Sequence, residues 1–346
     1  MVAARWRSTA RDVFLAVALV LTPPAALGCQ AIGTRSAFAT GDVSEELVYA
    51  RADDGIVDAG ALFSPRARPN KRIAVIWIHG SGVNFYYPSY VRAARELARR
   101  GLTTIVGNTR MHDLGNIAAF RESGPLRGGS YWGVTTDQVR DLAAWVQLAK
   151  DRGFERVVLV GHSAGATAVQ LYAARTQDPR VAGLVLASGR FRPAPGPVVD
   201  SARLARAREL VAAGHGDDPV PPSAPGATRS TTSAATLVDL ADMGTELTDF
   251  YGVQTPDPPV ARVRIPILAW FGTNGDVGTA ADLALLDTAV KRLRDGPSRV
   301  STAMIPQATH MFDGQEARVA RVLADWVHDV VLAGGRADRE TRPTAK

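Results

Sequence analysis

The fold is decided by one stretch of sequence, Val157-Val158-Leu159-Val160-Gly161-His162-Ser163-Ala164-Gly165. Its first four residues are apolar, as is typical of a strand buried on both faces of a parallel sheet. Residues 164–175 then predict a helix that begins directly after the strand. In that setting the Gly-x-Ser-x-Gly pattern predicts a sharp strand-to-helix turn, which exposes the Ser163 hydroxyl at the carboxyl edge of the sheet.

The turn requires glycine at two positions for a steric reason. A side chain at Gly161 or Gly165 would collide with the neighbouring strand or helix. The start of the helix also directs backbone N–H groups toward negative charge that develops near Ser163. The alternative is an incidental turn, but the strand before it and the helix after it favour a nucleophilic serine.

Strand-like and helix-like segments alternate on both sides of this turn, in the order that builds a mostly parallel sheet flanked by helices. We expect a hairpin of residues 48–50 and 57–63, joined by Asp53-Asp54-Gly55. We also expect Thr135 or Thr136 to be the N-cap of a helix at 135–150. The other expected strands are 73–78, 102–106, 157–160, 181–187, 265–271 and 302–305, and the expected helices are 90–100, 135–150, 164–175, 201–213, 280–293 and 317–332.

These segments predict a single α/β domain over residues 47–334, within a chain of 346 residues. A proline-rich stretch at 190–262 interrupts the alternation, and we interpret it as a small irregular or helical cap insertion over the carboxyl ends of the strands, where ligands bind in such sheets. Residues 29–46 are interpreted as a linker and residues 335–346 as a frayed tail.

The amino terminus is typical of an export signal, because arginines precede an apolar run at 13–21 and small residues follow. We place the signal at residues 1–28, and expect a periplasmic, secreted or lipid-anchored protein. Cys29 lies where a lipoprotein signal carries its acylated cysteine, although Ala26 replaces the usual leucine, so attachment to a membrane through a lipid on Cys29 and simple cleavage after Gly28 or Ala39 both stay open. Cys29 is the single cysteine, so no intrachain disulfide forms.

Composition and charge exclude several classes of function. The formal charge is +6, or +4 without the first 28 residues, and the arginines are scattered singly, so we expect no nucleic-acid partner. We find no ligand spacing typical of zinc and no phosphate-binding loop, and therefore expect neither a metal nor a cofactor.

A serine hydroxyl needs a base beside it and an acid that orients the base. His310 follows the last expected strand and precedes the last helix, so its loop opens at the same edge as Ser163. Asp276 follows the strand at 265–271 and lies between Ser163 and His310 in chain order. A turn-forming role for Asp276 after Asn274-Gly275 is the alternative, and Asp249 and Asp257 in the insertion are weaker candidates.

Acyl transfer also requires hydrogen-bond donors for an oxyanion. The backbone N–H of Ala164, directly after the serine, is the first candidate. The loop His79-Gly80-Ser81-Gly82 follows the first long buried strand, and we expect the N–H of Ser81 to be the second donor, with Gly82 next.

Together these residues resemble the α/β-hydrolase superfamily, over residues 48–332. The resemblance implies a triad of Ser163, Asp276 and His310, an acyl-enzyme mechanism and no cofactor. We favour a small-molecule carboxylic ester as substrate over a thioester or an amide, because nothing marks a peptide-binding groove. An acyltransferase with the same triad and a binding protein without activity are the alternatives, and the sequence leaves the oligomeric state open.

A second resemblance, at scattered positions, is to the family that contains fungal siderophore esterases. It is carried by Tyr131-Trp132-Gly133, Ala207-Arg208-Glu209-Leu210-Val211 and Asp249-Phe250-Tyr251. Nothing in the sequence identifies an iron-chelate substrate. Six aromatic residues near loops are expected either to line an acyl pocket or to pack in the core: Tyr86, Tyr87, Tyr131, Trp132, Phe250 and Tyr251.

Overall fold

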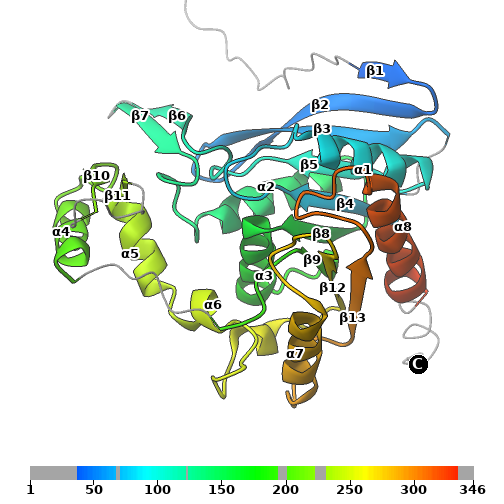
Figure 1. Cartoon of the computed structure of the whole chain (residues 1–346). Helices are drawn as coiled ribbons and strands as arrows, with labels where there is room; N and C mark the ends of the chain where they lie inside the picture. Colours follow the sequence, from blue (N-terminus) through cyan, green and yellow to red (C-terminus); the bar gives the residue numbers. More distant parts are fainter. Residues whose placement is uncertain (1–36, 68–70, 122–123, 194–200, 223–230, 334–346) are drawn as a thin grey trace, which may run out of the picture. The chain divides into compact units, whose positions relative to one another are not determined.

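A nine-stranded sheet organises the computed structural model, which describes residues 37–67, 71–121, 124–193, 201–222 and 231–333 (Figure 1). The strand order is β1-β2-β3-β5-β4-β8-β9-β12-β13. Strands β5, β4, β8, β9, β12 and β13 run parallel, and β1, β2 and β3 add an antiparallel edge. The strands are β1 Ala37–Thr40, β2 Val43–Arg51, β3 Val57–Pro65, β4 Ile73–Ile78, β5 Thr104–Gly107, β8 Arg156–His162, β9 Val181–Ala187, β12 Ile267–Gly272 and β13 Val300–Ile305.

Helices cover both faces of this sheet. The helices of the core are α1 Pro88–Arg99, α2 Gln138–Asp151, α3 Ala164–Thr176, α7 Ala280–Lys291 and α8 Glu316–Trp326, which continues as a π-helical segment over Val327–Leu332. Helices α2, α3 and α7 bury their apolar side chains on one face, and α1 and α8 on the other. This is the predicted α/β architecture.

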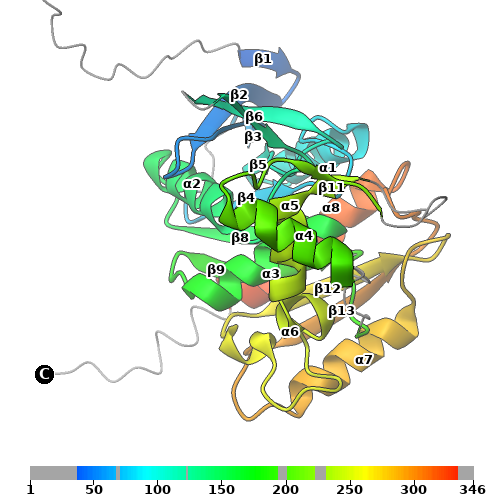
Figure 2. The same cartoon turned by 90° about the vertical axis from the view of Figure 1, so that its left-hand side faces the viewer.

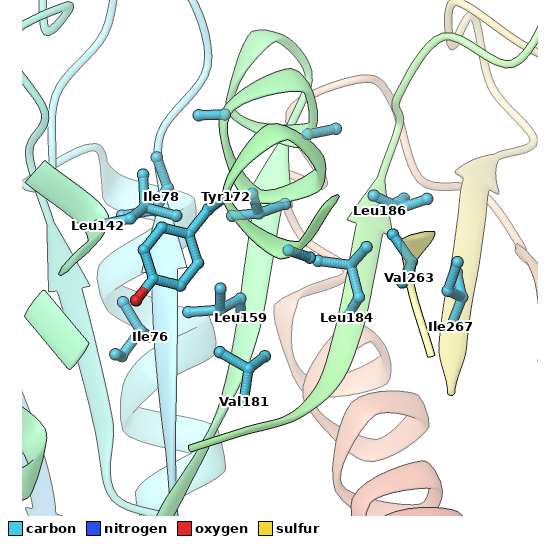
Figure 3. Packing of buried hydrophobic residues seen from close by; sticks show 14 of the residues in the cluster. Ile76, Ile78, Leu142, Leu159, Tyr172, Val181, Leu184, Leu186, Val263 and Ile267 are labelled. Carbon is cyan, nitrogen blue, oxygen red and sulfur yellow. The ribbon is translucent and has the colours of Figure 1, made fainter. Parts of the chain in front are cut away.

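The buried strands alternate their side chains between these two layers. In β4, Ile76 and Ile78 point toward α2 and α3, whereas Val75 and Trp77 belong to the layer of α1 and α8. Figure 3 shows Ile76 and Ile78 beside Tyr172 of α3. All six residues of β4 are buried, which is why an uninterrupted apolar run predicted its bounds correctly.

The expected linker at 29–46 is wrong over the part that the structure describes, because β1 and the first residues of β2 pair there as antiparallel strands. Two glutamates of β2 in this range form ion pairs with arginines of the helices. Glu45 accepts from Arg95 of α1 at 2.6 Å, and Glu46 accepts from Arg152 at the end of α2 at 2.8 Å. Residues 1–36, including Cys29 and the expected export signal, lie outside the described residues, as does the expected tail.

The cap insertion contains more helix than the sequence predicted. It holds α4 Ser201–Ala212, α5 Ala234–Asp242 and α6 Thr245–Thr248, a short 3-10 turn at Pro259–Arg262, and a two-stranded ladder of β10 Pro219–Val220 with β11 Thr232–Ser233. A second hairpin, β6 Asn116–Arg121 with β7 Gly124–Gly128, was not predicted. Figures 1 and 2 show α4 and α5 on the same side of the sheet as this hairpin.

Asp239 of α5 attaches the insertion to the start of α2. Its Oδ2 accepts the backbone N–H of Thr135 at 2.8 Å, and its Oδ1 accepts the hydroxyl of Thr136 at 2.5 Å. The expected N-cap at Thr135 or Thr136 is therefore wrong: α2 begins after Asp137, which makes no side-chain capping bond. In the described part of the chain, no helix has the length and apolar character that crossing a membrane requires.

Candidate active site

Ser163 occupies a strained turn between β8 and α3. Its φ is 54° and its ψ is −117°, a left-handed conformation that is unusual for a residue with a side chain. Its backbone N–H donates to the carbonyl of Ala187 in β9 at 2.8 Å, which holds the turn against the sheet. The serine is half-buried and lines a pocket, so the hydroxyl is accessible.

The flanking glycines are required by the packing of this turn. A Cβ on Gly161 would lie 2.2 Å from the carbonyl oxygen of Gly165 in α3. A Cβ on Gly165 would lie 2.4 Å from the carbonyl oxygen of His79. Both distances are far below van der Waals contact, so the predicted steric reason for the two glycines is confirmed.

His310 and Asp276 form a direct pair on the loops that follow β13 and β12. The His310 Nδ1 lies 2.8 Å from Asp276 Oδ1. The Asp276 side chain is fully buried, whereas 27% of the His310 side chain is exposed. An ionised carboxylate at Nδ1 requires the proton there, so the Nε2 atom is left free to accept a proton.

Three further donors fix the Asp276 carboxylate. Oδ2 accepts the Ser188 hydroxyl at 2.5 Å and the Gly272 N–H at 2.6 Å, and Oδ1 accepts the Val277 N–H at 2.7 Å. Burial raises the pKa of Asp276, but the hydrogen bonds from His310, Ser188 and these backbone groups outweigh it and hold the pKa below its usual range. Asp276 is therefore ionised at neutral pH and oriented toward His310, rather than simply closing a turn.

The loop of His310 lies against the chain neighbour of Ser163. The His162 Nε2 lies 2.8 Å from the carbonyl oxygen of His310, and the two imidazole rings are 4.8 Å apart between centroids. Within the described residues, no hydrogen bond joins the Ser163 hydroxyl to the His310 ring. The structure thus brings Asp276 and His310 into contact and places the His310 loop beside the serine turn, while the Ser163–His310 bond itself is not formed.

A buried chain of hydrogen bonds connects three loops at this edge. The Tyr90 hydroxyl of α1 accepts the N–H of Gly80 at 3.1 Å and donates to His162 Nδ1 at 2.6 Å. His162 then donates from Nε2 to the His310 carbonyl oxygen. Burial lowers the pKa of His162 to about 3, so it stays neutral with its proton on Nε2. Tyr90 and His162 therefore link the Gly80 loop, the Ser163 turn and the His310 loop.

His79 orients the peptide that carries the Ser81 N–H. Its Nδ1 lies 2.8 Å from the Gly80 carbonyl oxygen, and its Nε2 accepts the Thr109 N–H at 3.1 Å. Burial lowers the pKa of His79 to about 4, so Nδ1 donates and Nε2 accepts. Because C=O and N–H point in opposite directions across a trans peptide, this bond turns the Ser81 N–H away from His79.

The oxyanion candidates are only partly compatible with the structure. No hydrogen bond among the described residues uses the N–H of Ser81 or of Ala164, and both residues line one small pocket of about 170 Å³. The N–H of Gly82 donates to the Ser130 hydroxyl at 3.1 Å, so the prediction of Gly82 as a donor is wrong. The sequence could not show that Ser130 would occupy that N–H.

A larger pocket of about 630 Å³ shares Ala164 with this small pocket. We call it the Ser163 pocket. It is lined by Ser163, Ala164, Thr167, Gln170, Ser188, Gly189, Arg190, Phe191, Arg192, Pro193, Leu247, Thr248, Asp249, Phe250, Tyr251, Phe271, Val277, Gly278 and Asp282. The cap insertion thus contributes to the binding surface. Of the six aromatic residues considered, Phe250 and Tyr251 line this pocket, and both are buried.

Two functional positions could not be found from the sequence. Ser188, which contacts Asp276, stands at the end of β9 with a φ of 53°, and the only signal for it is its position after a buried strand. Tyr90 belongs to no sequence motif that would mark it as functional. Asp249, a weaker candidate for the acid, instead accepts hydrogen bonds from residues 253–255 within the insertion. Among the described residues, no group of three or more His, Cys, Asp and Glu side chains could hold a metal.

Comparisons with known proteins concern the fold and the segment around Ser163. The model of a family described as serine aminopeptidase S33 matches residues 69–215, which include Ser163 but end before Asp276. A thermostable carboxyl esterase from Bacillus coagulans has a TM-score of 0.58 at 14% identity, over 83% of this chain and 99% of that one. None of the curated proteins compared with the sequence matches it.

Est1E from Butyrivibrio proteoclasticus is a second structural neighbour. It has a TM-score of 0.53 at 17% identity, over 83% of this chain and 99% of that one. Its complex with ferulic acid gives a TM-score of 0.54 at the same identity. At these identities the likeness concerns the fold. With the mostly parallel sheet and the glycine-flanked serine after β8, it shows that this chain has the α/β-hydrolase fold.

Proposed function

We propose that the protein is a serine hydrolase that cleaves carboxylic esters through an acyl-enzyme on Ser163. The observation that carries this proposal is the 2.8 Å bond between His310 Nδ1 and a fully buried Asp276, on a loop that contacts the Ser163 turn through His162. A buried carboxylate at Nδ1 makes Nε2 the proton acceptor, which is the property that a base for Ser163 requires.

In this mechanism the Ser163 hydroxyl approaches His310 Nε2 by a change of its side-chain rotamer or of the His310 loop. Its oxygen attacks the ester carbonyl while His310 takes the proton, and the carbonyl oxygen accepts hydrogen bonds from Ala164 and Ser81. The protonated imidazole then gives that proton to the leaving alkoxide. In the second half a water loses its proton to His310 and attacks the acyl carbon. The bond to the Ser163 oxygen then breaks, His310 returns the proton to that oxygen, and the acid leaves.

The names of the structural neighbours support an ester over an amide. The Bacillus coagulans neighbour is a carboxyl esterase, and Est1E has been solved with ferulic acid bound. The family model, by contrast, is described as an aminopeptidase. The Ser163 pocket offers a space of about 630 Å³ beside the serine, with Phe250 and Tyr251 on its wall, which suits a small acyl or alcohol group.

Turnover of p-nitrophenyl esters of graded chain length tests this proposal. We expect hydrolysis with an initial burst of p-nitrophenol equal to the enzyme concentration, and loss of both burst and turnover in Ser163→Ala. The matched control is Ser89→Ala, a buried serine of α1 whose hydroxyl has no hydrogen-bond partner among the described residues. Activity that survives in Ser163→Ala would refute the assignment, and transfer of the acyl group to an added alcohol in preference to water would identify an acyltransferase.

We propose further that the protein is exported, on the basis of the amino-terminal sequence alone. The proposal rests on the arginines before the apolar run and on the small residues around Cys29. Expression of the full chain, followed by fractionation and intact-mass measurement, distinguishes a cleaved secreted form from a form acylated on Cys29. A mature protein that retains residues 1–28 would contradict export.

A further inference from the structure

The charged side chains of the Ser163 pocket are not equivalent. Four of its lining residues carry a formal charge at neutral pH: Arg190, Arg192, Asp249 and Asp282. Three of these four have partners within the protein.

Both carboxylates are already satisfied. Asp249 accepts the N–H groups of Val253 and Gln254, at 2.9 and 2.8 Å, and the hydroxyl of Thr255 at 2.8 Å. Asp282 accepts the N–H and the hydroxyl of Thr279, both at 2.7 Å, as the capping box of α7. Asp249 keeps its negative charge, but the residue is buried and its oxygens are turned toward residues 253–255, so neither carboxylate is left free to contact a ligand.

Of the two arginines, only one is paired. Arg192 is hydrogen-bonded to the Asp282 carboxylate, which neutralises both groups. Arg190 is exposed at the pocket and makes no ion pair, hydrogen bond or ring contact among the described residues. The charged group on the wall of the Ser163 pocket that is left without a partner among the described residues is thus the Arg190 guanidinium.

The backbone that carries Arg190 is held in place. Phe191 is buried, with its ring 5.2 Å from that of Phe271 and 5.5 Å from that of Tyr251. Two residues before Arg190, the Ser188 hydroxyl donates to Asp276. The backbone of Arg190 is therefore positioned by its neighbours, buried Phe191 on one side and Ser188, which contacts Asp276, on the other. Its exposed side chain can turn toward a ligand.

Other groups in the pocket are also donors. The Gln170 amide oxygen accepts the hydroxyl of buried Tyr251 at 2.7 Å, which turns the Gln170 NH₂ group away from that bond and leaves it for the pocket. The first turn of α3, with Ala164 and Thr167 on the pocket wall, adds the positive end of a helix dipole. The pocket thus combines one unpaired guanidinium with several N–H and O–H donors.

We propose that the Ser163 pocket selects esters that carry a carboxylate, which pairs with Arg190 while the ester carbonyl reacts at Ser163. The proposal rests on the proposed esterase function and specifies its substrate class. A guanidinium presents two parallel N–H donors that match a carboxylate. Because the carboxylate is remote from the reacting carbonyl, the preference belongs mainly in KM.

The test compares matched esters that differ by one carboxylate. On the acyl side these are mono-p-nitrophenyl glutarate and p-nitrophenyl valerate, and on the alcohol side 4-acetoxybenzoate and 4-methylphenyl acetate. We expect the wild-type protein to favour the anionic member of one pair by about tenfold in kcat/KM, an effect between those of an exposed ion pair and a charge-assisted hydrogen bond. The pair that shows the preference identifies the side of the ester that lies in the pocket.

Variants assign the preference to Arg190. Arg190→Gln should reduce it to about onefold and Arg190→Glu should reverse it, with the neutral esters little affected. Arg321→Gln, which removes an exposed arginine of α8 outside the pocket, is the control for net charge and should keep the preference. Added salt should weaken the preference in the wild type, because the pair is partly exposed.

The outcomes separate this proposal from the proposed function. Equal kcat/KM for both members of both pairs, or a preference that persists in Arg190→Gln, would overturn the role of Arg190 while ester hydrolysis stands. Absence of hydrolysis of all four esters by the wild type would overturn both proposals together.

Discussion

Replacement of Tyr90 by phenylalanine should uncouple the three loops of the site without disturbing the core. The ring of Tyr90 is fully buried and packs against Trp77 and His162, at centroid distances of 5.9 and 5.4 Å, and phenylalanine retains those contacts. Only the hydroxyl is lost. The Gly80 N–H, now 3.1 Å from that hydroxyl, and His162 Nδ1, now 2.6 Å from it, would then both lack a partner.

The magnitude follows from these two groups. An unsatisfied buried polar group costs about 1–3 kcal/mol, so Tyr90→Phe should lower the free energy of unfolding by about 2–4 kcal/mol after some relaxation. Without the bond from the Gly80 N–H to Tyr90, the peptide that carries the Ser81 N–H is held by the His79 bond alone and is less firmly placed. We therefore expect kcat to fall by about tenfold or more, with a smaller change in KM, because oxyanion contacts act in the transition state.

Urea denaturation and steady-state kinetics well below the melting temperature measure the two effects separately. Tyr87→Phe is the matched control, because the Tyr87 ring packs against Tyr90 at 5.6 Å and its hydroxyl makes no hydrogen bond within the described residues. It should change stability by less than about 0.5 kcal/mol and leave kcat intact. A Tyr90→Phe variant as stable and as active as Tyr87→Phe would refute the role assigned to the network.

Three other predictions concern the acid, the serine turn and a buried carboxyl. Ser188→Ala removes the 2.5 Å hydrogen bond to Asp276. It should lower kcat by about fivefold to tenfold with little loss of stability, as measured by kinetics and urea denaturation. An unchanged kcat would exclude a role for Ser188. Gly165→Ala places a Cβ 2.4 Å from a backbone oxygen and should cost about 3 kcal/mol in thermal or urea unfolding, so a stable, active variant would contradict the packing described for the turn. Asp58 is buried, its Oδ2 lacks a partner in the described part of the chain, and burial, with the charge of nearby Asp141, raises its pKa well above its usual range. Since folding raises that pKa, the wild-type protein loses stability as the pH rises above 4. Asp58→Asn should therefore raise the free energy of unfolding by about 1 kcal/mol or more at pH 8 and leave it nearly unchanged at pH 4, as measured in urea titrations. Exposed Asp53→Asn should show no such trend, and a parallel trend in both variants would contradict the prediction.

The parts of the fold that the sequence predicted are those whose signal is local. The bounds of β4 and β9 were correct because every residue in them is buried and apolar. The turn at Ser163 was correct because its glycines, strand and helix are contiguous. The antiparallel hairpin of β2 and β3 was also confirmed, although both strands are longer than expected.

The parts that the sequence missed depend on partners far along the chain. The first half of β2, residues 43–47, buries only some of its side chains and pairs its glutamates with arginines of α1 and at the end of α2, so it has no apolar run to detect. The hairpin of β6 and β7 contains Pro125 and two glycines, which are typical of loops. Likewise, no local pattern could indicate that Gly82 donates to Ser130 or that Tyr90 reaches His162.

Covalent labelling with a fluorophosphonate tests the central claim most directly, because the reagent reacts with a serine only where a base and an oxyanion site activate it. Peptide mass spectrometry should find one adduct, on Ser163, formed at a rate that falls by several orders of magnitude in His310→Ala and disappears in Ser163→Ala. An adduct on another residue, or labelling of Ser163 at the same rate without His310, would contradict the account.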